Sequence, residues 1–219
     1  MRSATISRKT NETEVTVSVA LSGGMADVGG SVRDCADVGS VRDCADVSAG
    51  RIDTPCGFLN HMLTLFSFHG GFSLNVTARG DTDVDYHHLT EDVGIALGQC
   101  IKDAVGDGRG VARYASQFLP MDEALILVAL DISGRAHLNY DVPITAQKVG
   151  DFDTELVGEF LSGLCRSLGL TLHVKLFYGV NAHHVIEAVF KGLGRALGKA
   201  TAIDASRGGV PSSKGSLFS

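Results

Sequence analysis

The chain has 219 residues, of which 44% are hydrophobic and 20% charged, a composition that excludes an intrinsically disordered protein. A formal net charge of −6 argues against an extended nucleic-acid surface, although a local cationic pocket for a small anion stays possible. The N-terminal residues have no signal-peptide pattern, and no apolar run approaches the ~18 residues of a membrane span. We therefore expect a cytoplasmic protein with no nucleic-acid partner and no membrane segment.

The chain carries two copies of one sequence pattern. The matching pairs are ETEVTVSVALSGG at 12–24 with EALILVALDISGR at 123–135, GFLNHML at 57–63 with EFLSGLC at 159–165, and HHLTE at 87–91 with HHVIE at 183–187. Three matches in the same order indicate a duplicated unit. We expect a first half-repeat over 1–112 and a second over 113–219, which together form one compact unit.

The first copy begins with a β-rich run at 13–21 that predicts a strand. Apolar residues at helical spacing follow at 58–69, and 72–79 reads as a short strand. A longer helix is expected to start at the double histidine of 87–88, with Val93, Leu97 and Ile101 on one face.

The second copy repeats this order. Strands are predicted at 124–131 and 170–177, with a helix at 153–168 between them. A final helix is expected to start at the second double histidine, 183–184. The two copies together predict an α+β protein with two sheets and four main helices.

One segment does not belong to the repeat. Residues 30–47 contain GSVRDCADV twice in tandem, rich in Gly, Asp and Ser and without a clean amphipathic period. This composition predicts a flexible surface loop over about 24–52. A metal-binding or redox-sensing loop that uses Cys35 and Cys44 is the alternative.

The cysteines do not form a disulfide or zinc-binding pattern. Their number is odd and none of them forms a CxxC pair; they are Cys35, Cys44, Cys56, Cys100 and Cys165. We expect reduced thiols, in agreement with a cytoplasmic location.

The two double histidines have the spacing of metal ligands. In a helix, residues i and i+4 share one face, so His87 points with Glu91, and His183 with Glu187. Each adjacent histidine is rotated by about 100° and faces another neighbour. An ordinary solvated helix start explains one such motif as well as a metal site does, but two at equivalent positions favour the metal site.

Two further histidines are natural additional ligands, His61 in the first helix and His173 in the TLHVK strand. Six imidazoles and two carboxylates without a thiolate suit Mn, Fe, Co or Ni, and zinc less exclusively. His69 and His137 lack a counterpart in the repeat, and we expect them to be structural.

Ordered sequence blocks place the chain near a known family. The blocks are GFLNHMLTLFSFHGGF, DYHHLTEDVGIALG, PMDEALILVALDISGR, VGDFDTELV, TLHVK, NAHHVIEAVFKGLGRAL and PSSKG. They resemble those of the imidazoleglycerol-phosphate dehydratases over nearly the whole chain, apart from about 24–52. The resemblance implies a tandem of ribosomal-protein-S5-domain-2-like units, with four helices between two four-stranded sheets.

The resemblance also implies an activity and a site. The activity is dehydration of D-erythro-imidazole glycerol phosphate to imidazole acetol phosphate in L-histidine biosynthesis, with two Mn(II) ions per active site. The implied assembly is a 24-mer of trimers, with active sites at subunit interfaces. The implied metal ligands are His61, His87, His88, Glu91, His173, His183, His184 and Glu187, of which His61, Glu91 and Glu187 also count as catalytic.

The remaining implied residues act on the substrate. Glu12 matches the acid/base glutamate and is expected to move the proton that leaves the carbon beside the departing hydroxyl. The residues implied to hold the substrate phosphate are Arg113, Arg135, Lys191, Ser213 and Lys214. Arginine forks and lysine point charges suit a phosphate monoester, although each of these side chains alone could be solvated surface.

The chain departs from the family pattern at two positions. Asn60 and Tyr86 stand where the family usually has Asp, each beside a presumed ligand, so we expect altered metal affinity or metal preference.

Two other classes of protein are the alternatives. A non-catalytic metal-binding shell protein would not need Glu12 or the Arg/Lys set. A two-metal phosphatase would be expected to carry more Asp ligands.

Overall fold

A computed structural model describes residues 2–21, 50–206 and 208–218 of the chain. The tandem GSVRDCADV segment, with Cys35 and Cys44, lies outside the described residues, so the predictions made for it are not tested. The described thiols are Cys56, Cys100 and Cys165, which are free and buried as expected.

The first sheet comes from the first copy of the repeat. Its four strands are β1 (Arg2–Lys9), β2 (Thr13–Leu21), β3 (Ile52–Asp53) and β4 (Ser73–Gly80). Their order is β1-β2-β4-β3, with β2 antiparallel to both neighbours and β3 parallel to β4. Along β2, Val15, Val17 and Val19 are buried in alternation with more exposed residues, so one face of the sheet covers the core.

The second sheet repeats this topology. It consists of β5 (Tyr114–Met121), β6 (Ala124–Asp131), β7 (His137–Asp141) and β10 (Thr171–Tyr178) in the order β5-β6-β10-β7. The edge strand β7 is parallel to β10, as β3 is to β4. A small hairpin of β8 (Lys148–Val149) and β9 (Phe152–Asp153) has no counterpart among the described strands of the first copy.

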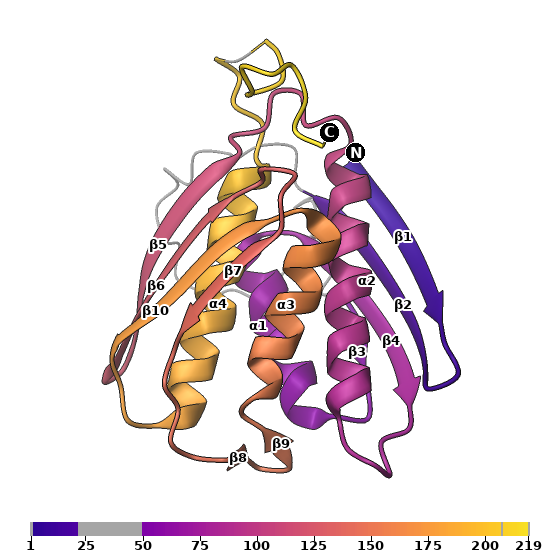
Figure 1. Cartoon of the computed structure of the whole chain (residues 1–219), viewed down its shortest axis with the longest axis vertical. Helices are drawn as coiled ribbons and strands as arrows, with labels where there is room; N and C mark the ends of the chain where they lie inside the picture. The colour runs from indigo at the N-terminus through magenta and orange to yellow at the C-terminus, as the bar shows by residue number, and fades with distance from the viewer. Residues whose placement is uncertain (1, 22–49, 207, 219) are drawn as a thin grey trace, which may run out of the picture.

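Four helices lie between the two sheets (Figure 1). They are α1 (Gly57–Gly70), α2 (His87–Val105), α3 (Leu156–Leu168) and α4 (Ala182–Thr201). Helix α1 packs on α4, and α2 packs on α3, so each helix of one copy pairs with a helix of the other. The two copies consequently share one core. No helix in the described ranges is long and apolar enough to cross a membrane.

Glycines let the paired helices approach closely. A Cβ added at Gly194 would lie 2.2 Å from the Phe66 carbonyl oxygen, and one added at Gly94 would lie 2.4 Å from that of Phe160. Side chains larger than hydrogen do not fit there. These contacts fix how α1 lies on α4 and how α2 lies on α3.

The predicted α+β architecture is confirmed, with four helices and two four-stranded sheets. One predicted boundary was wrong: the helix expected from residue 153 begins at Leu156, because Phe152 and Asp153 pair with β8. The sequence reading also missed the outer strands β1, β3, β5 and β7 and the β8–β9 hairpin.

Candidate metal and substrate site

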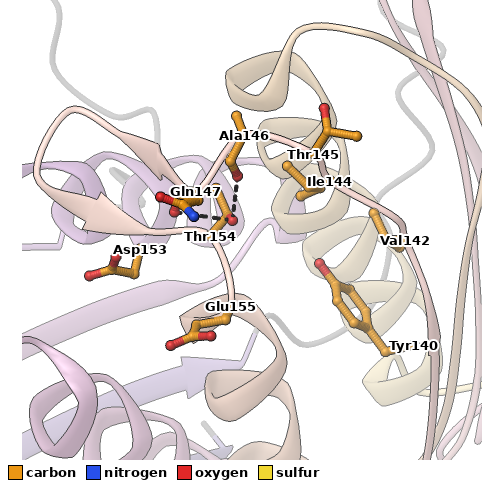
Figure 2. Close-up of a pocket in the computed structure, with 9 residues that line it drawn as sticks. All are labelled: Tyr140, Val142, Ile144, Thr145, Ala146, Gln147, Asp153, Thr154 and Glu155. Atoms are coloured by element: carbon orange, nitrogen blue, oxygen red, sulfur yellow. Dashed lines mark hydrogen bonds between the residues drawn. The ribbon is translucent and has the colours of Figure 1, made fainter.

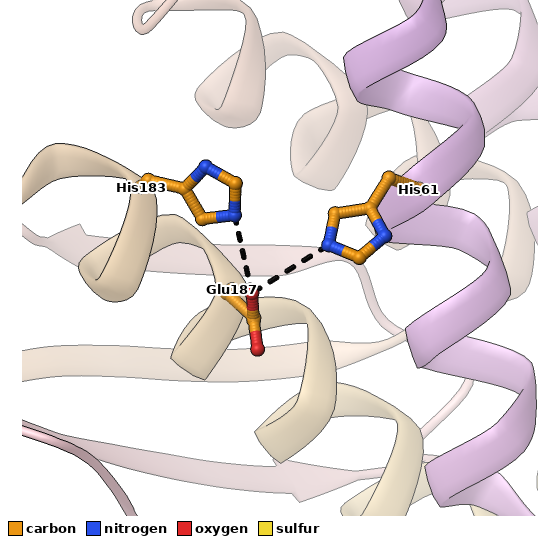
Figure 3. A group of neighbouring side chains, drawn as sticks. All are labelled: His61, His183 and Glu187. Atoms are coloured by element: carbon orange, nitrogen blue, oxygen red, sulfur yellow. Dashed lines mark hydrogen bonds and ion pairs between the residues drawn. The ribbon is translucent and has the colours of Figure 1, made fainter.

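Helices α1 and α4 bring three candidate ligands together (Figure 3). His61 Nε2 lies 3.6 Å and His183 Nε2 3.2 Å from the same oxygen, Glu187 Oε2. One ligand atom from each residue falls within 4.8 Å of the others. His183 and Glu187 are one helical turn apart, as the i,i+4 spacing predicted, and the side-chain oxygen of Asn181 caps the helix at the His183 backbone N–H, 2.9 Å away.

The carboxylate of Glu187 is buried and paired with a cation. Lys191 Nζ lies 2.5 Å from Oε1, the oxygen that does not face the histidines. Burial alone would raise the pKa of Glu187, but the hydrogen bond and charge of Lys191 outweigh it and lower the pKa below its usual value. Glu187 therefore stays anionic and presents Oε2 to the two rings. Nitrogen and oxygen donors in this arrangement fit a divalent first-row metal ion.

The second histidine of each pair is held by a carboxylate. His184 Nδ1 lies 2.7 Å from Glu123 Oε2, and His88 Nδ1 lies 2.9 Å from Asp81 Oδ2. These hydrogen bonds raise the pKa of both histidines, and the one from His184 lowers the pKa of Glu123 to about 2. Metal-binding histidines commonly carry such a carboxylate on one nitrogen, which leaves Nε2 for the metal.

Glu123 is a functional candidate that the sequence reading missed. Its repeat counterpart is Glu12, which was predicted to act on the substrate, and the structure places both beside the second histidine of a pair. Glu12 Oε2 lies 3.8 Å from His88 Nδ1, and Glu123 contacts His184. The alignment of 12–24 with 123–135 contained this signal, since a glutamate begins each strand segment.

The helix start of α2 is arranged differently from that of α4. Here Glu91 makes an ion pair with Arg166 of α3, not with a histidine from the neighbouring helix. The rings of His87 and His88 lie 5.8 Å apart, centroid to centroid, and nearly perpendicular. The α2 motif therefore presents three of the predicted ligands, but among the described residues they do not converge into a metal-binding cluster.

His173 lies apart from these clusters, on β10 in the second sheet. Its ring is exposed and 5.7 Å from that of His137, the histidine expected to be only structural. Two residues before it on the same strand, Thr171 contacts Ser133 and the Arg135 carbonyl. His173 therefore lies near the basic pocket described next.

Four of the five predicted phosphate-binding residues line one pocket of about 250 Å³, namely Arg113, Arg135, Ser213 and Lys214. The fifth, Lys191, lies outside it, on Glu187. Clustered Arg, Lys and Ser donors fit a phosphate monoester.

The guanidinium of Arg113 is fixed within this pocket. It donates to both oxygens of Asp131, at 2.7 and 3.2 Å, and to the Pro211 carbonyl at 2.7 Å. Arg113 also has a φ of 74°, rare for a residue other than glycine. Backbone strain of this kind is typical of functional positions, and the ion pair holds the residue in place.

The two ends of α4 lie at opposite ends of the subunit (Figure 1), with the candidate metal ligands at its start and the basic pocket near its end. The histidines are at the start of α4, whereas the Arg113 N–H donates to the Ala200 carbonyl near the end of that helix. Seventeen residues of helix separate His183 from Ala200, or about 25 Å. One small substrate does not reach both ends within one subunit.

A larger cavity, of about 460 Å³, lies elsewhere, between β7, the β7–β8 loop and the start of α3 (Figure 2). Asp153, Thr154 and Glu155 form one side of it, and none of its lining residues is a histidine, lysine or arginine. The Tyr140 hydroxyl is buried there with no hydrogen-bond partner among the described residues. The predicted ligands and the phosphate-binding residues are absent from its walls, so this cavity is not the predicted site.

Asn60 and Tyr86, the two departures from the family pattern, make their hydrogen bonds to residues other than histidines. The side chain of Asn60 accepts hydrogen bonds from the Thr54 N–H and hydroxyl, and donates one to the Thr54 carbonyl. The Tyr86 hydroxyl donates to Asp151, 2.8 Å away, and so joins the start of α2 to the β8–β9 hairpin. Among the described residues, the Asn60 side chain makes its hydrogen bonds to Thr54 and none to an imidazole.

The fold and these side chains together define a class: α+β proteins built from a duplicated unit, with a histidine–glutamate motif at the start of one helix in each copy. The family model for imidazoleglycerol-phosphate dehydratase matches residues 54–197. The imidazoleglycerol-phosphate dehydratase of Methylorubrum populi is 50% identical over 219 residues, covering 99% of this chain and 100% of that protein. The chain therefore belongs to the imidazoleglycerol-phosphate dehydratase family, hydro-lyases of histidine biosynthesis.

Solved structures agree with this assignment. The crystal structure of the dehydratase from Staphylococcus aureus superposes with a TM-score of 0.74 at 39% identity, covering 92% of this chain and 99% of that one. The structure of the enzyme from Pyrococcus furiosus in complex with (S)-C348 also superposes with a TM-score of 0.74. It is 36% identical, and the match covers 96% of this chain and 99% of that one.

Proposed function

We propose that this protein catalyses the Mn(II)-dependent dehydration of D-erythro-imidazole glycerol phosphate to imidazole acetol phosphate. The observation that carries the metal requirement is the convergence of His61, His183 and Glu187 within 4.8 Å, with nitrogen and oxygen donors only. The carboxylates on His88 and His184 support it, because they leave one nitrogen of each ring for a metal.

Two metal ions per active site would be held by the eight predicted ligands. These are His61, His87, His88, Glu91, His173, His183, His184 and Glu187. A bound divalent ion would act as a Lewis acid on the imidazole ring and as a template for the substrate.

Glu12 is the proposed proton carrier. Its exposed carboxylate lies 3.8 Å from His88, close to the predicted ligands of α2. It would take the proton from the carbon next to the one that loses hydroxide, and the resulting enol would tautomerise to the ketone. The leaving hydroxyl departs as water, so the reaction needs no further reactant.

The phosphate would be held by Arg113, Arg135, Ser213 and Lys214, with Lys191 reaching it from another position. Because the basic pocket and the helix starts are about 25 Å apart along α4, a complete site needs the two ends of different subunits. This separation supports active sites at subunit interfaces. The assembly into trimers and a 24-mer and the cytoplasmic location are proposed from the family resemblance.

The test is product formation from imidazole glycerol phosphate by metal-stripped full-length protein, with and without added Mn(II). We expect turnover only after Mn(II) is added; parallel additions of Fe(II), Co(II) and Ni(II) would show the metal preference. Turnover in the stripped protein would contradict the metal requirement. Stoichiometric Mn(II) binding without turnover would contradict the reaction.

A further inference from the structure

The two duplicated glutamates differ in which cation pairs with them. Glu187 carries Lys191 on Oε1 and keeps Oε2 for His61 and His183, so cation and histidines occupy different oxygens. Glu91 instead carries Arg166 on Oε1, from the neighbouring helix α3. No histidine of the described chain contacts the Glu91 carboxylate through an ion pair or hydrogen bond.

Close packing of α3 on α2 explains the difference. In the repeat, Gly163 of α3 stands where His61 stands in α1. A Cβ at Gly163 would lie 2.8 Å from the Glu91 carbonyl oxygen and 3.2 Å from Ile95 Cγ1, so an imidazole has no room there. Arg166 lies three residues further along α3, on the same face, and reaches the Glu91 carboxylate from there.

We propose that Arg166 is a competing cation at the second metal site, whose ion pair with Glu91 weakens the binding of a divalent ion there. This inference rests on the proposed function, which makes Glu91 a metal ligand. A guanidinium and a divalent cation on the same carboxylate repel each other, so the ion pair with Arg166 weakens metal binding at Glu91.

The exposed fraction of each cationic side chain sets how readily it can leave its glutamate. The side chain of Arg166 is 56% exposed, whereas that of Lys191 is 17% exposed. Arg166 can swing into solvent at the small cost of an exposed ion pair, whereas Lys191 stays with Glu187. Because His61, His183 and Glu187 already converge, the α4 site binds its metal first and more tightly, and the α2 site follows as Arg166 is displaced.

The test is a Mn(II) titration of metal-stripped full-length protein, followed by electron paramagnetic resonance of the free ion. Wild-type protein is expected to show a tighter and a weaker class of site. Arg166→Gln should tighten the weaker class by roughly two- to fivefold, the range that an exposed ion pair is worth, and leave the tighter class unchanged. Arg166→Lys, which retains the charge, should stay near wild type.

Two further variants separate the explanations. Arg109→Gln removes an equal charge from an exposed arginine beside Asp107, beyond the other end of α2, and should not tighten either class. If Arg166→Gln binds no more tightly than Arg109→Gln, or more weakly, the competition is overturned. Glu91→Gln should abolish the weaker class; if both classes survive it, Glu91 is no ligand, and the proposed ligand set fails as well.

Discussion

At the scale of single residues, Asp81 and Glu123 orient the second histidine of each pair through its Nδ1. We predict that Glu123→Gln lowers Mn(II) affinity by about 10- to 100-fold, because an amide holds the His184 ring more weakly than a carboxylate does. Mn(II) titration measures this. Glu155→Gln, at an exposed glutamate beside the large cavity, is the control and should bind as wild type. Equal affinities for the two variants would refute the role of Glu123.

Glu12 provides a second prediction at this scale. Glu12→Gln should lower kcat by about 10² or more, because the amide cannot take a proton, while Mn(II) binding stays close to wild type. Steady-state kinetics and a metal titration on the same sample check both parts. Glu14, two residues along and paired with Lys9 at the surface, gives the matched control Glu14→Gln with normal turnover. An active Glu12→Gln enzyme would remove Glu12 from the mechanism.

At the scale of elements, the crossing of α1 and α4 sets the distance between His61 and Glu187. Gly194→Ala would bring a Cβ to 2.2 Å from the Phe66 carbonyl oxygen, so the helices must move apart. We expect a loss of about 1–3 kcal/mol in the free energy of unfolding, together with weaker Mn(II) binding. Urea denaturation and metal titration measure the two effects.

The control for this prediction is Gly57→Ala at the start of α1, where an added Cβ meets no atom within 4 Å. It should change neither stability nor metal binding appreciably. A Gly194→Ala protein as stable as Gly57→Ala would show that the helix crossing adjusts without strain.

Local pattern explains which elements could be predicted. The helices and the strands β2, β4, β6 and β10 were predicted because their apolar periodicity occurs twice in the chain. The outer strands β1, β3, β5 and β7 were missed, since β1, β3 and β7 contain no buried residue and β5 only Leu119. The start of α3 shifted because the β8–β9 hairpin occupies residues that continue the helical pattern.

In the candidate site too, some contacts could be predicted from local sequence spacing and others could not. Helical spacing alone predicted that His183 lies beside Glu187, and the structure confirms that contact. The contacts of Asp81 and Arg166 could not be predicted, because packing brings them to His88 and Glu91 from elements distant in the sequence. The catalytic and substrate-binding roles stay predictions until variants are measured.

At the scale of the whole molecule, the proposed function gives each subunit a metal-binding end and a phosphate-binding end. Glu187→Gln should disable the first, and Lys214→Ala the second, so each variant alone should be nearly inactive. Refolded together, they should recover about a quarter of wild-type activity, since random assembly pairs two intact ends at one site in four. Activity assays before and after mixed refolding measure this.

The control is each variant refolded alone under the same conditions, which should recover no activity. If the mixture stays as inactive as the separate variants, both ends of a working site belong to one chain. Such a result would contradict sites between subunits, whatever the size of the assembly.

The length of α4 has a consequence for genetics. Because this helix separates the two ends, a chain that is damaged at one end would, in the proposed assembly, still serve its neighbour at the other. A cell that carries two different defective copies of the gene, one damaged at each end, should grow without added histidine, although neither copy supports growth alone. A defective gene copy beside a normal one should lower the activity, because its subunits would inactivate the active sites that they share with normal subunits.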